Sequence, residues 1–80
     1  MKARVFVTLK KTVLDPQGQA ILQALTRIGY RGIQEVRQGK VFEIHLDGLS
    51  QEEARKQIER VAQEGLTNPV IEEYRYELEE

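Results

Sequence analysis

The sequence lacks the residues on which several kinds of site depend. It contains no cysteine, which excludes a disulfide framework, a thiolate zinc site, an iron–sulfur site and a thiol nucleophile. A single histidine is too little for a histidine-based metal cluster. No apolar run approaches the ~20 residues that a membrane-spanning helix needs. We therefore expect a function that requires neither a bound metal nor a membrane.

An excess of charge of one sign is missing as well. Twelve Lys and Arg residues oppose thirteen Asp and Glu residues, which leaves a net charge of −1. Proteins that bind nucleic acid usually carry an excess of basic residues. A sheet that binds RNA also needs several exposed aromatic side chains on its central strands, and Phe6 is the one candidate for that role here. We expect no nucleic-acid partner. The N-terminal residues lead directly into a strand pattern rather than a signal peptide, so we expect a cytoplasmic protein.

What the sequence does contain is typical of one small soluble domain. Its 80 residues are 40% hydrophobic and 31% charged, and no linker or low-complexity segment divides them. We therefore expect a single domain over residues 1–80. A chain of this length buries only about 60–65% of its unfolded surface, so its core must be thin.

The first half of the chain predicts a strand, a helix and a hairpin. Residues 3–9 alternate between two faces, as a strand does. Asp15 suits a helix N-cap, and Pro16 suits the first helical position. Gly29 suits the residue of left-handed backbone conformation that ends a helix, so these signals predict a helix over 16–28. Residues 32–38 predict a weaker strand with a bulge, because Ile33 and Val36 are three apart. A tight turn at 38–40 and a strand over 41–47 complete the hairpin.

The second half of the chain predicts one more helix and one more strand. Ser50 and Glu53 match a capping box, and an apolar stripe follows at helical spacing until Gly65. Asn68 and Pro69 then act as a helix breaker. Residues 70–78 predict the last strand.

The resulting order, β-α-β-β-α-β, is typical of an α+β, ferredoxin-like (split βαβ) fold: an antiparallel sheet with two helices on one face. The first and last strands should then be antiparallel neighbours, with their opposite charges either paired across the strands or simply solvated. Phe6, Val41 and His45 should point away from the helices. We interpret this open face as an oligomer-forming interface, although scattered exposed hydrophobic residues are also normal on a monomer.

The search for chemistry finds no catalytic set. His45 lies within a predicted strand with no nucleophile near it, so a surface role is favoured. Gly39 and Lys40 fit a hairpin turn better than a phosphate contact. The segment from Asp15 to Gly18 is first a helix start, and alternatively a loop that grips a ligand or partner. The pair Asn68-Pro69 is first a helix-to-strand turn.

Several longer motifs resemble a known family. The string from Val13 through Asp15-Pro16-Gln17-Gly18 to Ile21 resembles the opening signature of PurS, the small subunit of phosphoribosylformylglycinamidine synthase. The resemblance continues through Gly29-Tyr30 and Val36–Lys40, and it closes with the string from Asn68-Pro69 to Glu72. It covers essentially the whole chain, with a small variation at Leu66-Thr67.

The resemblance implies a structural subunit without an active site of its own, within a glutamine- and ATP-dependent ligase of purine biosynthesis. Its implied partners are a second copy, as a homodimer or tetramer, the synthetase large subunit and the glutaminase subunit, between which ammonia passes. This chain would bind no cofactor, while the synthetase subunit uses ATP and magnesium. From where the family-like strings fall, we expect the partner and interface residues to be Phe6, Lys10, Asp15, Pro16, Gly18, Arg37, Gly39, Lys40, Asn68 and Pro69.

Two alternatives share the predicted fold. A regulatory ACT-like module that binds a small molecule often has an Asp-x-Pro-Gly-like string before its first helix, but here Pro16 follows Asp15 directly. An enzyme of the acylphosphatase type needs an arginine in a glycine-rich loop after the first strand, and Lys10-Lys11-Thr12 is no such loop. Amino-acid binding measured by calorimetry would favour the first of these.

Overall fold

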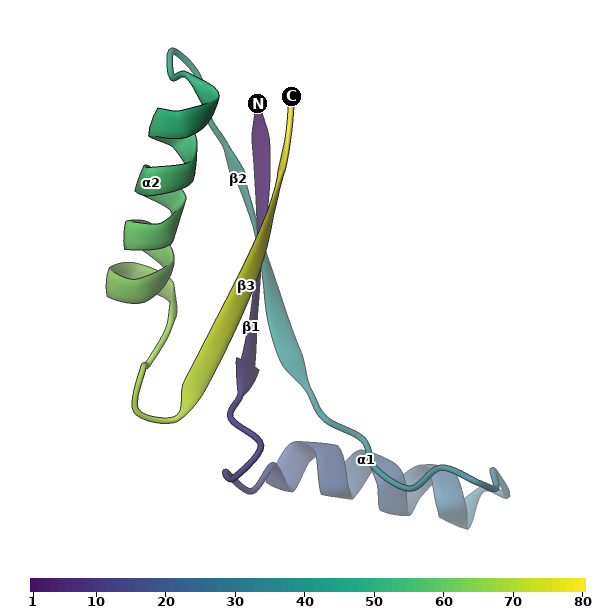
Figure 1. Ribbon diagram of the computed structural model, residues 1–80. Coiled ribbons are helices and arrows are strands. Elements are labelled where there is room, and N and C mark those ends of the chain that lie inside the picture. The colour runs from purple at the N-terminus through teal and green to yellow at the C-terminus, as the bar shows by residue number, and fades with distance from the viewer.

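The computed structural model describes residues 1–80 and contains three strands and two main helices (Figure 1). In chain order the elements are β1 (Lys2–Leu9), α1 (Pro16–Arg27), β2 (Gly39–His45), α2 (Gln51–Val61), the π-helical turn η1 (Ala62–Leu66) and β3 (Glu72–Glu79). The predicted α+β class, with an antiparallel sheet and two helices, is confirmed.

The sheet has the order β2-β1-β3, and both pairings are antiparallel. The central strand β1 places Val5 opposite Phe42 on one side and Tyr76 on the other. The predicted antiparallel contact between the first and last strands is therefore confirmed. It brings the two chain termini side by side at one end of the sheet (Figure 1).

The core is small and lies between one face of the sheet and α2. Val5 and Val7 on β1 are buried against Ile58 of α2 and Ala62 of η1. Alternation along β2 and β3 brings further apolar side chains to this face, and Leu46 and Leu66 join them from outside the strands. All of these side chains are only partly buried: Phe42, Ile44, Leu46, Leu66, Tyr74, Tyr76 and Leu78. The helix α2 runs along the sheet, as Figure 1 shows.

The helix α1 does not pack on this core, and this corrects the prediction that both helices cover one face. No residue of α1 belongs to the core cluster, and the helix extends away from the foot of the sheet (Figure 1). The chain is consequently 50 Å long, and its radius of gyration is 16.2 Å. A compact domain of this length has a radius of gyration of about 12 Å.

The predicted hairpin is also wrong. Residues 32–38 form no strand, because no neighbouring strand is present for them to pair with. Gly39 and Lys40 are not a turn but the first residues of β2, where they pair with Thr8 and Val7. The strand therefore begins two residues earlier than expected and ends at His45.

Predictions based on local signals agree with the structure. Asp15 caps α1, Pro16 occupies its first position, and Gly29 adopts a φ of 108° beyond its end. The capping box of Ser50 and Glu53 is present at the start of α2. The second helix continues past Gly65 as η1, so its predicted end is one residue early. No helix in the structure has the length and apolar character required to cross a bilayer.

Candidate functional site

Many of the candidate residues meet where α1 leaves the sheet, a region that we call the elbow (residues 10–18 and 36–40). Asp15 is its centre, with only 4% of its surface exposed. One carboxylate oxygen of Asp15 accepts a 2.9 Å hydrogen bond from the Gly18 N–H, and the other accepts a 2.7 Å bond from the Gln38 N–H. The Asp15 side chain thus caps α1 and also binds the backbone of Gln38, which lies 23 residues later in the sequence.

These two hydrogen bonds also stabilise the charge of Asp15. The backbone N–H of Gln38 lowers the pKa of Asp15 most, the N–H of Gly18 adds to the effect, and the charge of Arg37 contributes further. Burial raises the pKa of Asp15 but does not cancel the lowering. Asp15 is therefore ionised at neutral pH, and both of its oxygens are engaged within the chain.

Gly18 allows the two parts of the elbow to approach closely. A Cβ atom at this position would lie 2.1 Å from the carbonyl oxygen of Val36 and 2.9 Å from a carboxylate oxygen of Asp15. No larger side chain fits without moving the backbone of residue 36. The glycine is thus required by packing rather than by an unusual backbone angle.

Arg37 joins the elbow from the opposite side. Its guanidinium donates hydrogen bonds of 3.0 Å to the carbonyl oxygens of Lys10 and Val13. The loop between β1 and α1 is therefore held against the segment that returns from α1. Sequence reasoning assigned Arg37 a charge for partners, whereas this internal use of its donors had no signal in the sequence.

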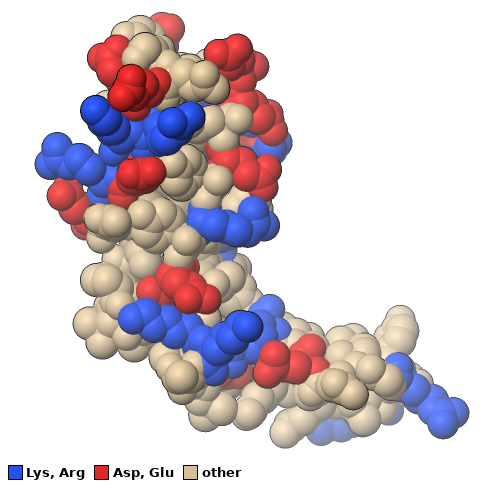
Figure 2. All heavy atoms as spheres, in the orientation of Figure 1, with Lys and Arg blue, Asp and Glu red and all other residues tan.

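The turn before β3 adjoins the elbow at Lys40 and Lys10. The Lys40 ammonium lies 3.9 Å from a carboxylate oxygen of Glu72, whose other oxygen accepts a 2.7 Å bond from the Asn68 N–H. The Lys10 N–H donates to the Ile71 carbonyl oxygen at 2.9 Å. Lys40 and Asp15 thus line the same hollow, and Glu72 links Lys40 to the Asn68-Pro69 turn. Figure 2 shows basic and acidic side chains side by side where the sheet meets α1.

Phe6 lies apart from the elbow, on the open face of the sheet. The guanidinium carbon of Arg75 sits 3.9 Å from the centre of its ring, a cation–π contact. Val41 and His45 are exposed on the same side, as predicted. Charged side chains surround these three residues on the same face, and its interpretation as an oligomer-forming interface stays a prediction.

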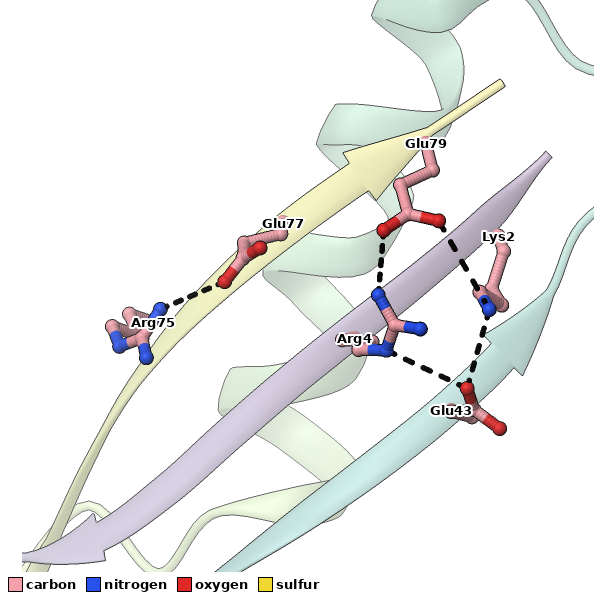
Figure 3. Close-up of polar contacts among 6 residues, drawn as sticks. All are labelled: Lys2, Arg4, Glu43, Arg75, Glu77 and Glu79. Atoms are coloured by element: carbon pink, nitrogen blue, oxygen red, sulfur yellow. Dashed lines mark hydrogen bonds and ion pairs between the residues drawn. The ribbon is translucent and has the colours of Figure 1, made fainter.

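The charged side chains of the open face form a network across all three strands (Figure 3). Arg4 of β1 contacts Glu43 of β2 and Glu79 of β3, and Lys2 contacts the same two carboxylates. A hydrogen bond and the charge of Lys2 lower the pKa of Glu43, and Arg4 adds a smaller effect. Of the two alternatives left open for the charges of the first and last strands, the structure shows pairing, and β2 takes part in it too.

Part of the exposed apolar surface lies on α1 and in the segment that follows it, while Val41 and Val70 are exposed elsewhere. Ile21 is 40% exposed and Ile28 is 71% exposed, and Tyr30 and Ile33 follow in the returning segment. The sequence correctly predicts an apolar stripe on this helix. It could not indicate that the stripe would lack a partner within the chain.

Comparison with known proteins identifies the family. A sequence model of the PurS family, described as phosphoribosylformylglycinamidine (FGAM) synthase, matches residues 2–80. The chain belongs to the PurS family. A PurS relative from Bacillus subtilis, named as a subunit of phosphoribosylformylglycinamidine synthase, is 42% identical over 99% of this chain and 93% of its own length.

Solved PurS structures share the fold of this chain. The B. subtilis PurS structure superposes with a TM-score of 0.87 over 99% of this chain and 98% of that chain, at 42% identity. Methanocaldococcus jannaschii PurS, described as one of the subunits of formylglycinamide ribonucleotide amidotransferase, gives 0.88 at 34% identity over 99% and 95%. A chain in the structure of PurLQS from Thermotoga maritima gives 0.87 at 28% identity over 95% and 93%.

Proposed function

We propose that this PurS chain is the non-catalytic joining subunit of phosphoribosylformylglycinamidine synthase in purine biosynthesis. In this role it bridges the ATP-dependent synthetase subunit and the glutaminase subunit and supports the passage of ammonia between them. The observation that carries the proposal is the likeness, over 95% of the chain, to a chain of the T. maritima PurLQS assembly. ATP and magnesium are then used by the synthetase subunit, and the assembly works in the cytoplasm.

We propose that the elbow is the surface through which this chain contacts the larger subunits. Asp15, Pro16 and Gly18 fix its shape, because Asp15 is buried and both of its oxygens are bonded within the chain. Lys10 and Lys40 supply charge at its surface, and the Lys40 side chain is 62% exposed despite its contact with Glu72. Arg37 supports the same loop from within.

Reconstitution tests the proposed function. We expect glutamine-dependent amidation of formylglycinamide ribonucleotide only when this chain is combined with the synthetase and glutaminase subunits. Each pair of subunits without the third should give no such activity. Full glutamine-dependent activity in the absence of this chain would refute the proposal.

Charge reversal at Lys40 tests the assignment of the elbow. We expect Lys40→Glu to fold, because this exposed side chain makes only a long contact with Glu72, yet to lose co-purification with at least one larger subunit. Lys56→Glu is the matched control, because Lys56 is exposed on α2, away from the elbow. Equal recovery of the complex by the two variants would show that Lys40 makes no such contact.

A further inference from the structure

The chain contains three side chains of the kind that can react with the backbone that follows them: Asp15, Asp47 and Asn68. An aspartyl or asparaginyl side chain closes a five-membered ring when the next backbone nitrogen attacks its carbonyl carbon. The attacking nitrogen must carry a hydrogen atom, which proline lacks. Asp15 and Asn68 are each followed by proline, so this reaction is closed to both. Asp47 is followed by Gly48, the residue that hinders such an attack least.

The structure leaves Asp47 and Gly48 accessible and unbonded. Both residues are exposed in the loop that joins β2 to α2. The Asp47 carboxylate takes part in no hydrogen bond or ion pair, and the Gly48 N–H donates to no acceptor. Gly48 also has a φ of 74°, a left-handed conformation that places no side chain beside the attacking nitrogen. Asp15 differs in this respect as well, because both of its carboxylate oxygens accept hydrogen bonds.

The hydrogen bonds that hold this loop stop on either side of the reacting pair. Before the pair, the Leu46 N–H donates to the Met1 carbonyl oxygen at 2.8 Å. After it, the N–H and the hydroxyl of Ser50 belong to the capping box of α2. Residues 47–49 lie between these points and make no backbone–backbone hydrogen bond. The backbone bonds that must rotate for ring closure are therefore not held by hydrogen bonds.

We propose that Asp47-Gly48 is a site of spontaneous modification at which Asp47 becomes isoaspartate. The Gly48 nitrogen bonds to the side-chain carbonyl carbon of Asp47, and one carboxylate oxygen leaves as water with the N–H proton and one proton from solvent. A water molecule then opens the resulting succinimide ring. Cleavage at the side-chain carbonyl restores aspartate, whereas cleavage at the main-chain carbonyl gives isoaspartate. The proposal goes beyond the joining role and does not depend on it.

The product differs from aspartate in the length of its backbone and in the position of its charge. The main chain of isoaspartate runs through the side chain and is longer by one CH₂ group, and the free carboxylate moves to the α-carbon. The change falls between Leu46, which is bonded to Met1, and Ser50, which caps α2. The modification thus lengthens the link that spaces α2 from the sheet.

Incubation of the unmodified chain in water labelled with heavy oxygen tests the proposal. Each opening of the ring adds one labelled oxygen atom to residue 47. Trypsin, applied after return to ordinary water, cleaves after Lys40 and Arg55 and releases residues 41–55, which contain no other aspartate. We expect this peptide to gain label at residue 47 and to separate into two species, one of which co-elutes with a synthetic isoaspartyl standard.

Two variants and one internal peptide are the controls. Asp47→Glu retains the charge and leaves Gly48 in place, but its longer side chain cannot close the five-membered ring, so its peptide should gain no label. Asp47→Asn should give the same isoaspartyl peptide several-fold faster, because a neutral amide is attacked more readily than a carboxylate. The peptide that contains Asp15 should stay unlabelled, because Pro16 has no N–H.

Other outcomes would overturn the proposal. Label and isoaspartyl peptide that appear in urea but not in the folded chain would show that the fold holds Asp47 in an unreactive conformation. Their absence under both conditions would show that the pair does not react. Label at residue 47 of Asp47→Glu would show simple exchange of carboxylate oxygens. None of these measurements needs the synthetase or glutaminase subunit, and reconstituted amidation tests the joining role separately.

Discussion

Gly18 is the residue whose size matters most at the elbow. A Cβ atom there would overlap the carbonyl oxygen of Val36, which is backbone and cannot rotate away. We expect Gly18→Ala to lower the free energy of unfolding by about 1–3 kcal/mol, the usual cost of overpacking. Urea denaturation followed by circular dichroism measures this change.

Gly65 provides the matched control for Gly18. It lies in η1, and a Cβ atom added there would meet nothing within 4 Å. Gly65→Ala should therefore leave the stability unchanged or raise it by about 0.5–1 kcal/mol, because alanine restricts the unfolded chain. Equal losses from the two variants would show that close packing at Gly18 is not the cause.

Asp15 shows how much of a single residue can be predicted from its neighbours in sequence. The string Asp-Pro before an apolar helical stripe predicts an N-cap, and the bond to the Gly18 N–H confirms it. The second bond, to the Gln38 N–H, joins residues far apart in the sequence and follows no local pattern. The elbow as a site was therefore only partly predictable, since its parts were named but their mutual contacts were not.

Among the elements, α2 depends on a capping box. The Ser50 hydroxyl accepts a hydrogen bond from the Glu53 N–H, and the Glu53 carboxylate accepts one from the Ser50 N–H. We expect Ser50→Ala to lower the free energy of unfolding by about 1 kcal/mol, because an N–H at the start of the helix loses its partner. Thermal and urea denaturation measure the loss.

Gln57→Ala serves as the comparison for Ser50→Ala, because it removes an exposed side chain from the middle of the same helix. Alanine has a slightly higher helix propensity than glutamine, so this variant should be as stable as the unmodified chain. A similar loss from both variants would mean that the cap contributes nothing specific.

The segment 32–38 shows why one predicted element does not form. Helices close their hydrogen bonds within a segment of sequence, so caps and spacing predict them well. A strand needs a neighbour, and the single chain provides none for these residues. Likewise, the apolar stripe of α1 predicts a buried helix face but not which molecule buries it. Both differences concern contacts between elements far apart in the sequence, which no local pattern specifies.

The open face of the sheet shows a second limit of sequence patterns. Alternation correctly placed Phe6, Val41 and His45 on one side of the sheet. The register of strand pairing decides which charged side chains surround these three residues. It places Arg4 opposite Glu43 of β2 and Glu77 of β3. With that register, Arg4 reaches carboxylates on both edge strands, and Arg75 covers Phe6.

For the whole molecule, three carboxylates with lowered pKa predict how stability depends on pH. Backbone hydrogen bonds lower the pKa of Asp15, Lys2 lowers that of Glu43, and Ser50 lowers that of Glu53. Each folded-state pKa lies below its unfolded value, so the stabilisation is complete above that value, about 4, and is lost as the pH falls further. Urea midpoints measured from pH 7 to pH 3 should decrease mainly below pH 5.

Asp15→Asn isolates one contribution to this acid dependence. Asparagine still caps a helix but has no carboxylate to protonate. We expect the variant to be less stable than the unmodified chain at pH 7 and to lose less stability on acidification. Parallel pH curves for the two proteins would show that Asp15 does not contribute.

The elongated shape also concerns the molecule as a whole. A chain that is 50 Å long with a thin core leaves much of its apolar surface for contacts with other chains. This shape suits a subunit whose role is to join others, because the sheet end and the α1 end of an elongated molecule present separate surfaces.

The pairing of Lys2 with Glu79 has a practical consequence for protein engineering. The first and last residues adjoin at the end of the sheet that lies away from the elbow (Figure 1). A short flexible linker can therefore connect Glu80 to Met1, and new termini can be opened in the exposed loop at Asp47-Gly48. Such a circular permutant would carry a fluorescent label or affinity tag at the end of the sheet that is remote from the elbow (Figure 1).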